Sequence, residues 1–76
     1  MKPEPDMAVT RAHVTHEINQ IARNFECLGE DAAASATVDH IELFWPPLLK
    51  EVLAGYARGH PAAFSRIAGK AIALLP

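Results

Sequence analysis

Apolar residues recur along this chain three and four positions apart, the spacing of one face of an α-helix. Four such stretches follow one another, and no stretch alternates with the period of two that a half-buried strand requires. The pattern predicts an all-α fold, a compact bundle of about four short helices over residues 10–27, 32–45, 47–58 and 61–74. The predicted core consists of Ile18, Ile21, Phe25, Val38, Ile41, Val52, Phe64 and Ile67.

The residues at the ends of these stretches predict where each helix begins and ends. Thr10 and Asp31 carry side chains that cap helix N-termini, so they are predicted to begin the first and second helices. Gly29 is suited to follow the first helix, because glycine adopts the left-handed conformation of a C-terminal cap. Pro46-Pro47 ends the second helix, and Pro61 is predicted to occupy the first position of the fourth.

The beginning of the chain and its length favour a small domain that completes its burial elsewhere. Residues 1–9 contain two prolines and mixed charges without a period, which predicts a flexible tail and leaves residues 10–76 as a single helical domain. A chain this short buries only about 60% of the surface that its unfolded form exposes. Because half of its residues are apolar, we expect part of the apolar surface to be buried against a partner protein.

A run with almost no polarity joins the second and third predicted helices, over residues 44–49. At about 100° per residue, Phe44 and Trp45 fall on opposite sides of Ile41, so a small core is expected to enclose only one of the two rings. The other ring is predicted to form an apolar docking patch with Leu43 or Leu49. Trp45 itself is either a core residue or an interface anchor.

Two amides, Asn19 and Gln20, lie in the middle of the first predicted helix. They are either ordinary surface residues or hydrogen-bonding groups for the backbone of a partner. The predicted partner-binding residues are therefore Asn19, Gln20, Leu43, Phe44, Trp45, Pro47 and Leu49.

Residues with catalytic chemistry form few patterns. His13, His16 and Glu17 form H-x-x-H-E near the start of the first helix, but the helical zinc motif requires histidines four apart with the glutamate between them. The lone Cys27 has no second cysteine for an internal disulfide. We expect an exposed helix face at the histidines, and no catalytic residue, cofactor or metal site in this chain.

Charge is distributed unevenly. Residues 1–45 carry three basic and eight acidic residues, and residues 46–76 carry four basic and one acidic, giving −5 and +3 within an overall charge of −2. A negative total disfavours nucleic acid as a partner. No leader peptide and no apolar run of about 18 residues is present, so we expect a cytoplasmic protein that does not bind membranes.

Three local strings together resemble a known family. They are Asn19-Gln20-Ile21-Ala22 with Phe25, His40-Ile41 followed by Phe44-Trp45-x-Pro47, and Phe64-Ser65-x-Ile67-Ala68. Over residues 10–75 the chain resembles the delta subunit of the NAD-dependent, molybdenum- or tungsten-containing formate dehydrogenases of bacteria. It departs from that pattern at Pro46, where an acidic residue is more common, and at Leu48-Leu49, where Arg-Met is more common.

The resemblance implies a non-catalytic accessory subunit that supports assembly or stability of a cytoplasmic complex. In that family the larger subunits carry the molybdopterin, the iron–sulfur clusters and the flavin, and the catalytic subunit is the expected partner. The alternative is a small helical DNA-binding or regulatory module, for which Gly59 would form the turn and Arg66 and Lys70 would provide basic contacts. A free-standing enzyme is a third and weaker interpretation.

Overall fold

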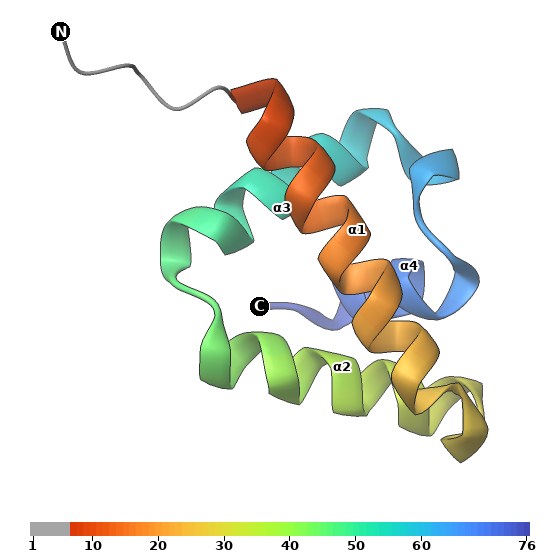
Figure 1. Cartoon of the computed structure of the whole chain (residues 1–76). Coiled ribbons are helices and arrows are strands. Elements are labelled where there is room, and N and C mark those ends of the chain that lie inside the picture. Colours follow the sequence, from red (N-terminus) through yellow and green to blue (C-terminus); the bar gives the residue numbers. More distant parts are fainter. Residues whose placement is uncertain (1–6) are drawn as a thin grey trace, which may run out of the picture.

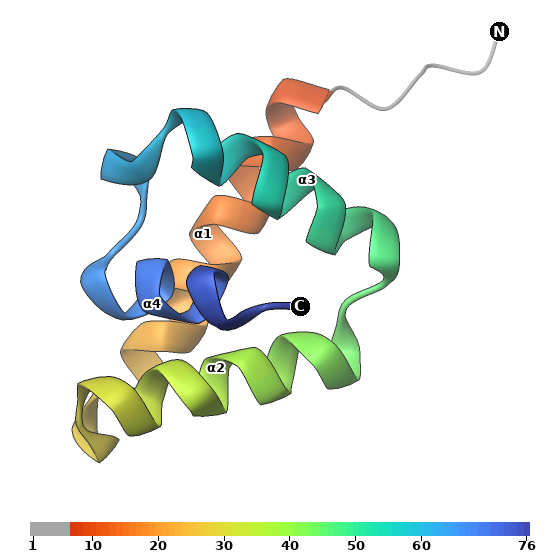
Figure 2. The same cartoon turned by 180° about the vertical axis from the view of Figure 1, so that it is seen from behind.

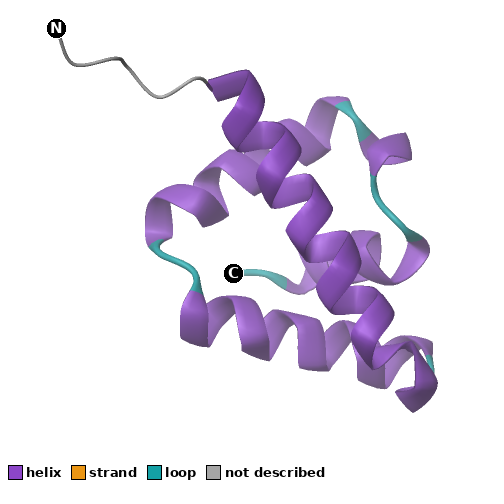
Figure 3. Ribbon diagram, viewed as in Figure 1, coloured by secondary structure: helices purple, strands orange, loops and turns teal. Residues whose placement is uncertain are grey.

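The computed structural model describes residues 7–76, which form helices joined by short connections (Figures 1 and 3). No strand occurs among these residues. The predicted all-α class and the four α-helices are confirmed. In chain order the elements are α1 (Met7–Phe25), the 3₁₀ turn η1 (Glu26–Leu28), α2 (Glu30–Phe44), α3 (Pro47–Gly59), the 3₁₀ turn η2 (Pro61–Ala63) and α4 (Arg66–Leu74).

Helix α1 crosses the other three helices and contacts each of them. Seen from behind, α4 lies between α2 and α3 (Figure 2). The most extensive helix–helix contact joins α2 and α4. The C-terminal segment after α4 therefore ends between the two helices that frame the α2–α3 connection.

One cluster of buried side chains draws on all four helices. Of the eight predicted core residues, Ile18, Ile21 and Ile41 are buried and the others are half-buried, and Val52, Phe64 and Ile67 among these pack against the core cluster. Leu53 of α3, which belongs to the same apolar face as Val52, is fully buried instead of it. The cluster consists of Val14, Ile18, Ala22, Ile41, Leu53 and Ala68.

Small residues make up much of the α2–α4 contact. Ala33, Ala34 and Thr37 of α2 and Ala68 and Ala71 of α4 are all buried. The Thr37 hydroxyl donates to the Ala33 carbonyl oxygen at 2.7 Å, so its burial leaves no polar atom unsatisfied. Because these side chains are short, α2 and α4 can approach each other closely.

The start of α1 corrects one prediction. The helix begins at Met7 and runs through Thr10, so Thr10 is not its N-cap and the last three residues of the predicted tail are helical. Met7 and Ala8 both favour helix, and no proline follows Pro5 to interrupt it. The rest of the predicted tail, residues 1–6, lies outside the described residues.

The connection between α1 and α2 differs from the prediction at Asp31. Helix α1 ends at Phe25 and tightens into η1, as helix C-termini often do. Gly29 adopts φ 94° and ψ 156°, and its carbonyl oxygen accepts the Ala33 N–H at 2.8 Å. Gly29 therefore occupies the N-cap position of α2, and the predicted cap Asp31 lies inside the first turn.

The fourth helix is shorter than predicted. Pro61 begins the single turn η2 instead of α4, and Phe64 then adopts an extended conformation with φ −113° and ψ 142°. The Ser65 hydroxyl accepts the Ala68 N–H at 3.2 Å and caps α4, which begins at Arg66. The half-buried Phe64 side chain packs against the core cluster from this extended residue.

Candidate docking surface

The corner between α2 and α3, residues 43–49, has a closely defined backbone. Trp45 and Pro46 are both extended, with φ −94° and −67°, and Pro47 is the first residue of α3. The Trp45 N–H donates to the Ile41 carbonyl oxygen at 2.9 Å, and the Leu49 N–H donates to that of Pro46 at 3.1 Å. Because each proline ring fixes its φ angle, little backbone freedom is left at this corner.

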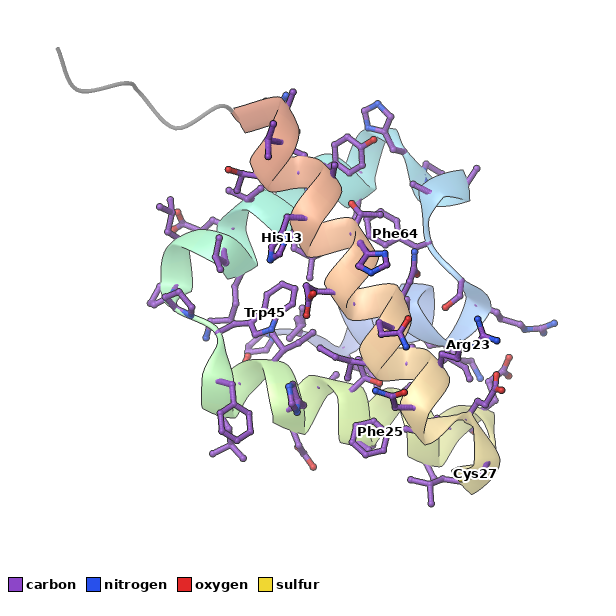
Figure 4. All side chains as sticks on the ribbon, viewed as in Figure 1. His13, Arg23, Phe25, Cys27, Trp45 and Phe64 are labelled. Carbon is purple, nitrogen blue, oxygen red and sulfur yellow. The ribbon has the colours of Figure 1, made fainter. Side chains whose placement is uncertain are left out.

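The apolar side chains of this corner divide into an inner and an outer group. Trp45 and Leu49 are half-buried and pack against the core cluster, and Figure 4 shows Trp45 directed inwards between α2 and α3. Leu43, Phe44 and Leu48 are 77%, 68% and 66% exposed. We call these three residues the corner patch.

The prediction that only one of the two aromatic rings would be enclosed is confirmed, with Trp45 inside and Phe44 outside. Leu43 joins the exposed ring as predicted. The second leucine of the patch is Leu48 instead of Leu49, because the two side chains point about 100° apart on α3 and Leu49 shares the inward face. Pro47 is exposed.

The Phe44 ring is supported from its own helix. Its centroid lies 4.8 Å from that of His40, one turn earlier on α2, with the two ring planes inclined at 48°. Lys50 Nζ lies 3.4 Å from Glu42 Oε2 and links α3 to α2 beside the corner. An exposed ion pair of this kind adds little stability, but both contacts restrict the conformations that the corner adopts.

The structure gives Asn19 a different role from the predicted one. Its Nδ2 donates to the Ala63 carbonyl oxygen at 3.0 Å, and its Oδ1 accepts the Ser65 N–H at 2.9 Å. The amide therefore bonds to this chain's own backbone, at the connection between η2 and α4. That connection and the α2–α3 corner lie on opposite sides of the molecule in both views (Figures 1 and 2). Gln20, the next residue, is exposed.

The predicted partner-binding residues thus do not form one continuous surface. Leu43, Phe44 and Pro47 are exposed at the corner, whereas Trp45 and Leu49 pack against the core cluster. Asn19 belongs to another part of the fold. Sequence reasoning missed Leu48, which the helical spacing of α3 could have separated from Leu49.

The other candidate groups of the sequence are dispersed. His13 and His16 are exposed on α1, and Cys27 is exposed in η1 (Figure 4). Within residues 7–76, no three histidine, cysteine, aspartate or glutamate side chains come close enough to hold a metal ion. None of the helices in this part of the chain has the length and apolar character that a membrane span requires.

The basic residues of α4 pair with the acidic first turn of α2. Arg66 Nε lies 2.6 Å from Glu30 Oε1, and Lys70 Nζ lies 2.8 Å from Glu30 Oε2 and 2.6 Å from Asp31 Oδ1. The hydrogen bonds from Lys70 are the largest cause that lowers the pKa of Glu30 and of Asp31, and in return they raise the pKa of Lys70. The two basic residues that a DNA-binding role would require are thus engaged within the chain.

Comparison with known proteins places the chain in a family. Residues 4–72 match the NADH-dependent formate dehydrogenase delta subunit FdsD, which is most of the 76-residue chain. Searches of curated proteins and of solved structures found no match. The matched region contains the whole of α1, α2 and α3, the corner patch and most of α4. The chain therefore belongs to the family of delta subunits of NADH-dependent formate dehydrogenases.

Proposed function

We propose that this protein is a non-catalytic accessory subunit that supports the assembly or stability of a cytoplasmic NAD-dependent formate dehydrogenase complex. Membership of the delta-subunit family supports a place in such a complex. In this proposal the chain acts by protein–protein contact, and the corner patch docks onto the catalytic subunit. The chemistry of formate oxidation belongs to the larger subunits.

The observation that carries the proposal is the exposure of three large apolar side chains, Leu43, Phe44 and Leu48, at one corner of the fold. Single exposed leucines are common on protein surfaces. Three exposed large apolar side chains within six residues concentrate apolar surface at one corner, and exposed apolar surface of this kind typically marks interaction sites. Aromatic residues are also enriched in protein interfaces, which suits Phe44 as the central contact.

The rigidity of the corner supports the same proposal. Two prolines restrict the backbone of the corner, Trp45 and Leu49 pack against the core, and the Phe44 ring contacts His40. Immobilising side chains and backbone opposes association, and a patch that is already ordered loses less freedom when it docks. The corner therefore has the two properties expected of a docking surface, apolar area and a fixed shape.

A co-purification experiment with matched leucine variants tests this proposal. The tagged full-length chain is co-expressed with the larger formate dehydrogenase subunits, as wild type, as Leu43→Ala/Leu48→Ala and as Leu28→Ala/Leu74→Ala. Leu28 and Leu74 are 55% and 57% exposed but belong to η1 and α4, so they control for the loss of two exposed leucines. We expect the corner variant to recover at least about tenfold less of the larger subunits. The control should recover wild-type amounts.

Assembly is tested in cells that lack the gene for this chain. The wild-type gene and the Leu28→Ala/Leu74→Ala gene should restore the amount of assembled, active dehydrogenase. The Leu43→Ala/Leu48→Ala gene should not. Full restoration by the corner variant, at equal expression, would show that the complex does not need this surface.

A further inference from the structure

Each leucine of the corner patch has an exposed carboxylate one helical turn away. Asp39 precedes Leu43 by four residues on α2, and Glu51 follows Leu48 by three residues on α3. Residues at these spacings are neighbours on a helix surface. Neither carboxylate forms an ion pair with another residue in the described range 7–76. The patch is thus bordered by acidic groups on both helices.

Other charged groups also lie near the corner, and Arg11 of α1 lines one pocket together with Glu51. Glu42 and Lys50 also lie between α2 and α3, but they pair with each other at 3.4 Å. The carboxylates of Asp39 and Glu51 outnumber the guanidinium of Arg11, so the net charge beside the corner patch is negative. A surface that docks here encounters an apolar centre with a negative border.

We infer that the surface that receives the corner patch is an apolar recess bordered by lysine or arginine side chains, an inference that rests on the proposed function. Basic groups opposite Asp39 and Glu51 provide the charge complementarity that steers encounter and excludes wrong partners. The same charges argue against a second copy of this chain as the occupant. Two copies joined patch to patch would bring four carboxylates together, and like charges across an interface oppose association.

Charges at the border of an interface act mainly on the rate of encounter. They attract the partner over roughly 10 Å at moderate ionic strength, and dissolved salt screens that attraction. The apolar centre acts mainly on the rate of dissociation. Changes to the border charges should therefore alter mainly the association rate, and changes to the apolar centre should alter mainly the dissociation rate.

The test measures association and dissociation rates between the full-length chain and the larger formate dehydrogenase subunits purified without it, at about 50 mM and 500 mM salt. The variants are Asp39→Asn and Glu51→Gln, singly and together. Glu26→Gln is the matched control, because Glu26 is an exposed carboxylate in η1, at the opposite end of α2. Leu43→Ala/Leu48→Ala is measured alongside.

We expect wild-type association to slow by about tenfold between low and high salt. Asp39→Asn/Glu51→Gln should associate about fivefold more slowly than wild type at low salt and lose most of the salt dependence. Glu26→Gln should behave as wild type does.

Three outcomes would overturn the inference. If the salt dependence survives in Asp39→Asn/Glu51→Gln while Leu43→Ala/Leu48→Ala loses binding, the docking surface stands but its partner is not basic. If the leucine variant binds as wild type does, the proposed docking function fails as well. If sedimentation of the isolated chain shows a dimer that Leu43→Ala/Leu48→Ala abolishes, a second copy is the occupant.

Discussion

The backbone N–H of Ser65 donates to the Oδ1 of Asn19 at 2.9 Å, a contact that joins residues 46 positions apart. The same amide donates to the Ala63 carbonyl oxygen at 3.0 Å. Ser65 in turn caps α4 through the Ala68 N–H. One side chain of α1 thus holds both sides of the extended residue Phe64 and fixes the point at which α4 begins.

Replacing Asn19 should destabilise the fold without touching the corner. We expect Asn19→Ala to lower the free energy of unfolding by about 1 kcal/mol, because two exposed hydrogen bonds that join α1 to the η2–α4 connection are lost. Gln20→Ala, the adjacent exposed amide, should stay within about 0.5 kcal/mol of wild type. Urea unfolding measures both. Equal stability of the two variants would show that the amide of Asn19 is dispensable for the fold.

The stability contributed by the ion pairs between α2 and α4 should depend on pH in a defined direction. The pKa values of Glu30 and Asp31 are lowered in the folded chain, so their contribution is complete above the unfolded values of about 4.3 and 3.9. It is lost as the pH falls through the lowered folded values. The pKa of Lys70 is raised, so its contribution is complete below about 10.4 and is lost as the pH rises through the raised folded value.

Lys70→Met removes the shared partner of both carboxylates and tests this directly. Between about pH 5 and pH 9 the variant should be less stable than wild type by a constant amount. That difference should shrink below about pH 4 and above about pH 10.5. Urea unfolding midpoints across this range provide the measurement. A difference that persists unchanged at pH 2 would mean that the Lys70 stem contributes by packing and not by its charge.

The two aromatic residues of the corner should contribute unequally to stability. Trp45 packs against the core, so Trp45→Ala should cost about 2–3 kcal/mol, below the range for fully buried rings because Trp45 is half-buried. Phe44 is 68% exposed, and Phe44→Ala should change stability by no more than about 0.5 kcal/mol. Thermal melting of the isolated chain separates them. Equal losses would place Phe44 in the core as well.

Helical periodicity was sufficient to predict much of the fold. The four helices, the break at Pro46-Pro47 and the enclosure of only one corner ring all follow from local spacing and proline geometry. Helix α3 agrees with its predicted range to within one residue. These features depend on neighbouring residues alone.

The features that the sequence could not predict depend on long-range packing. The Asn19–Ser65 contact depends on how α1 meets the η2–α4 connection, which the spacing of residues along one helix does not reveal. The small residues of the α2–α4 contact did not enter the predicted core list, which contained only large apolar residues. Residue type alone favours Asp31 as the N-cap of α2. In the fold Gly29 takes that position, and the Asp31 carboxylate pairs with Lys70 of α4.

The dissociation constant of Phe44→Ala for the larger formate dehydrogenase subunits, measured beside its melting temperature, tests the central proposal most directly. Phe44 is the aromatic centre of the corner patch and contributes little to the fold, so its loss should act on docking alone. We predict a weakening of at least about 30-fold, or about 2 kcal/mol, with the melting temperature unchanged. Binding within about twofold of both wild type and Leu28→Ala would contradict the proposal that this corner is the docking surface.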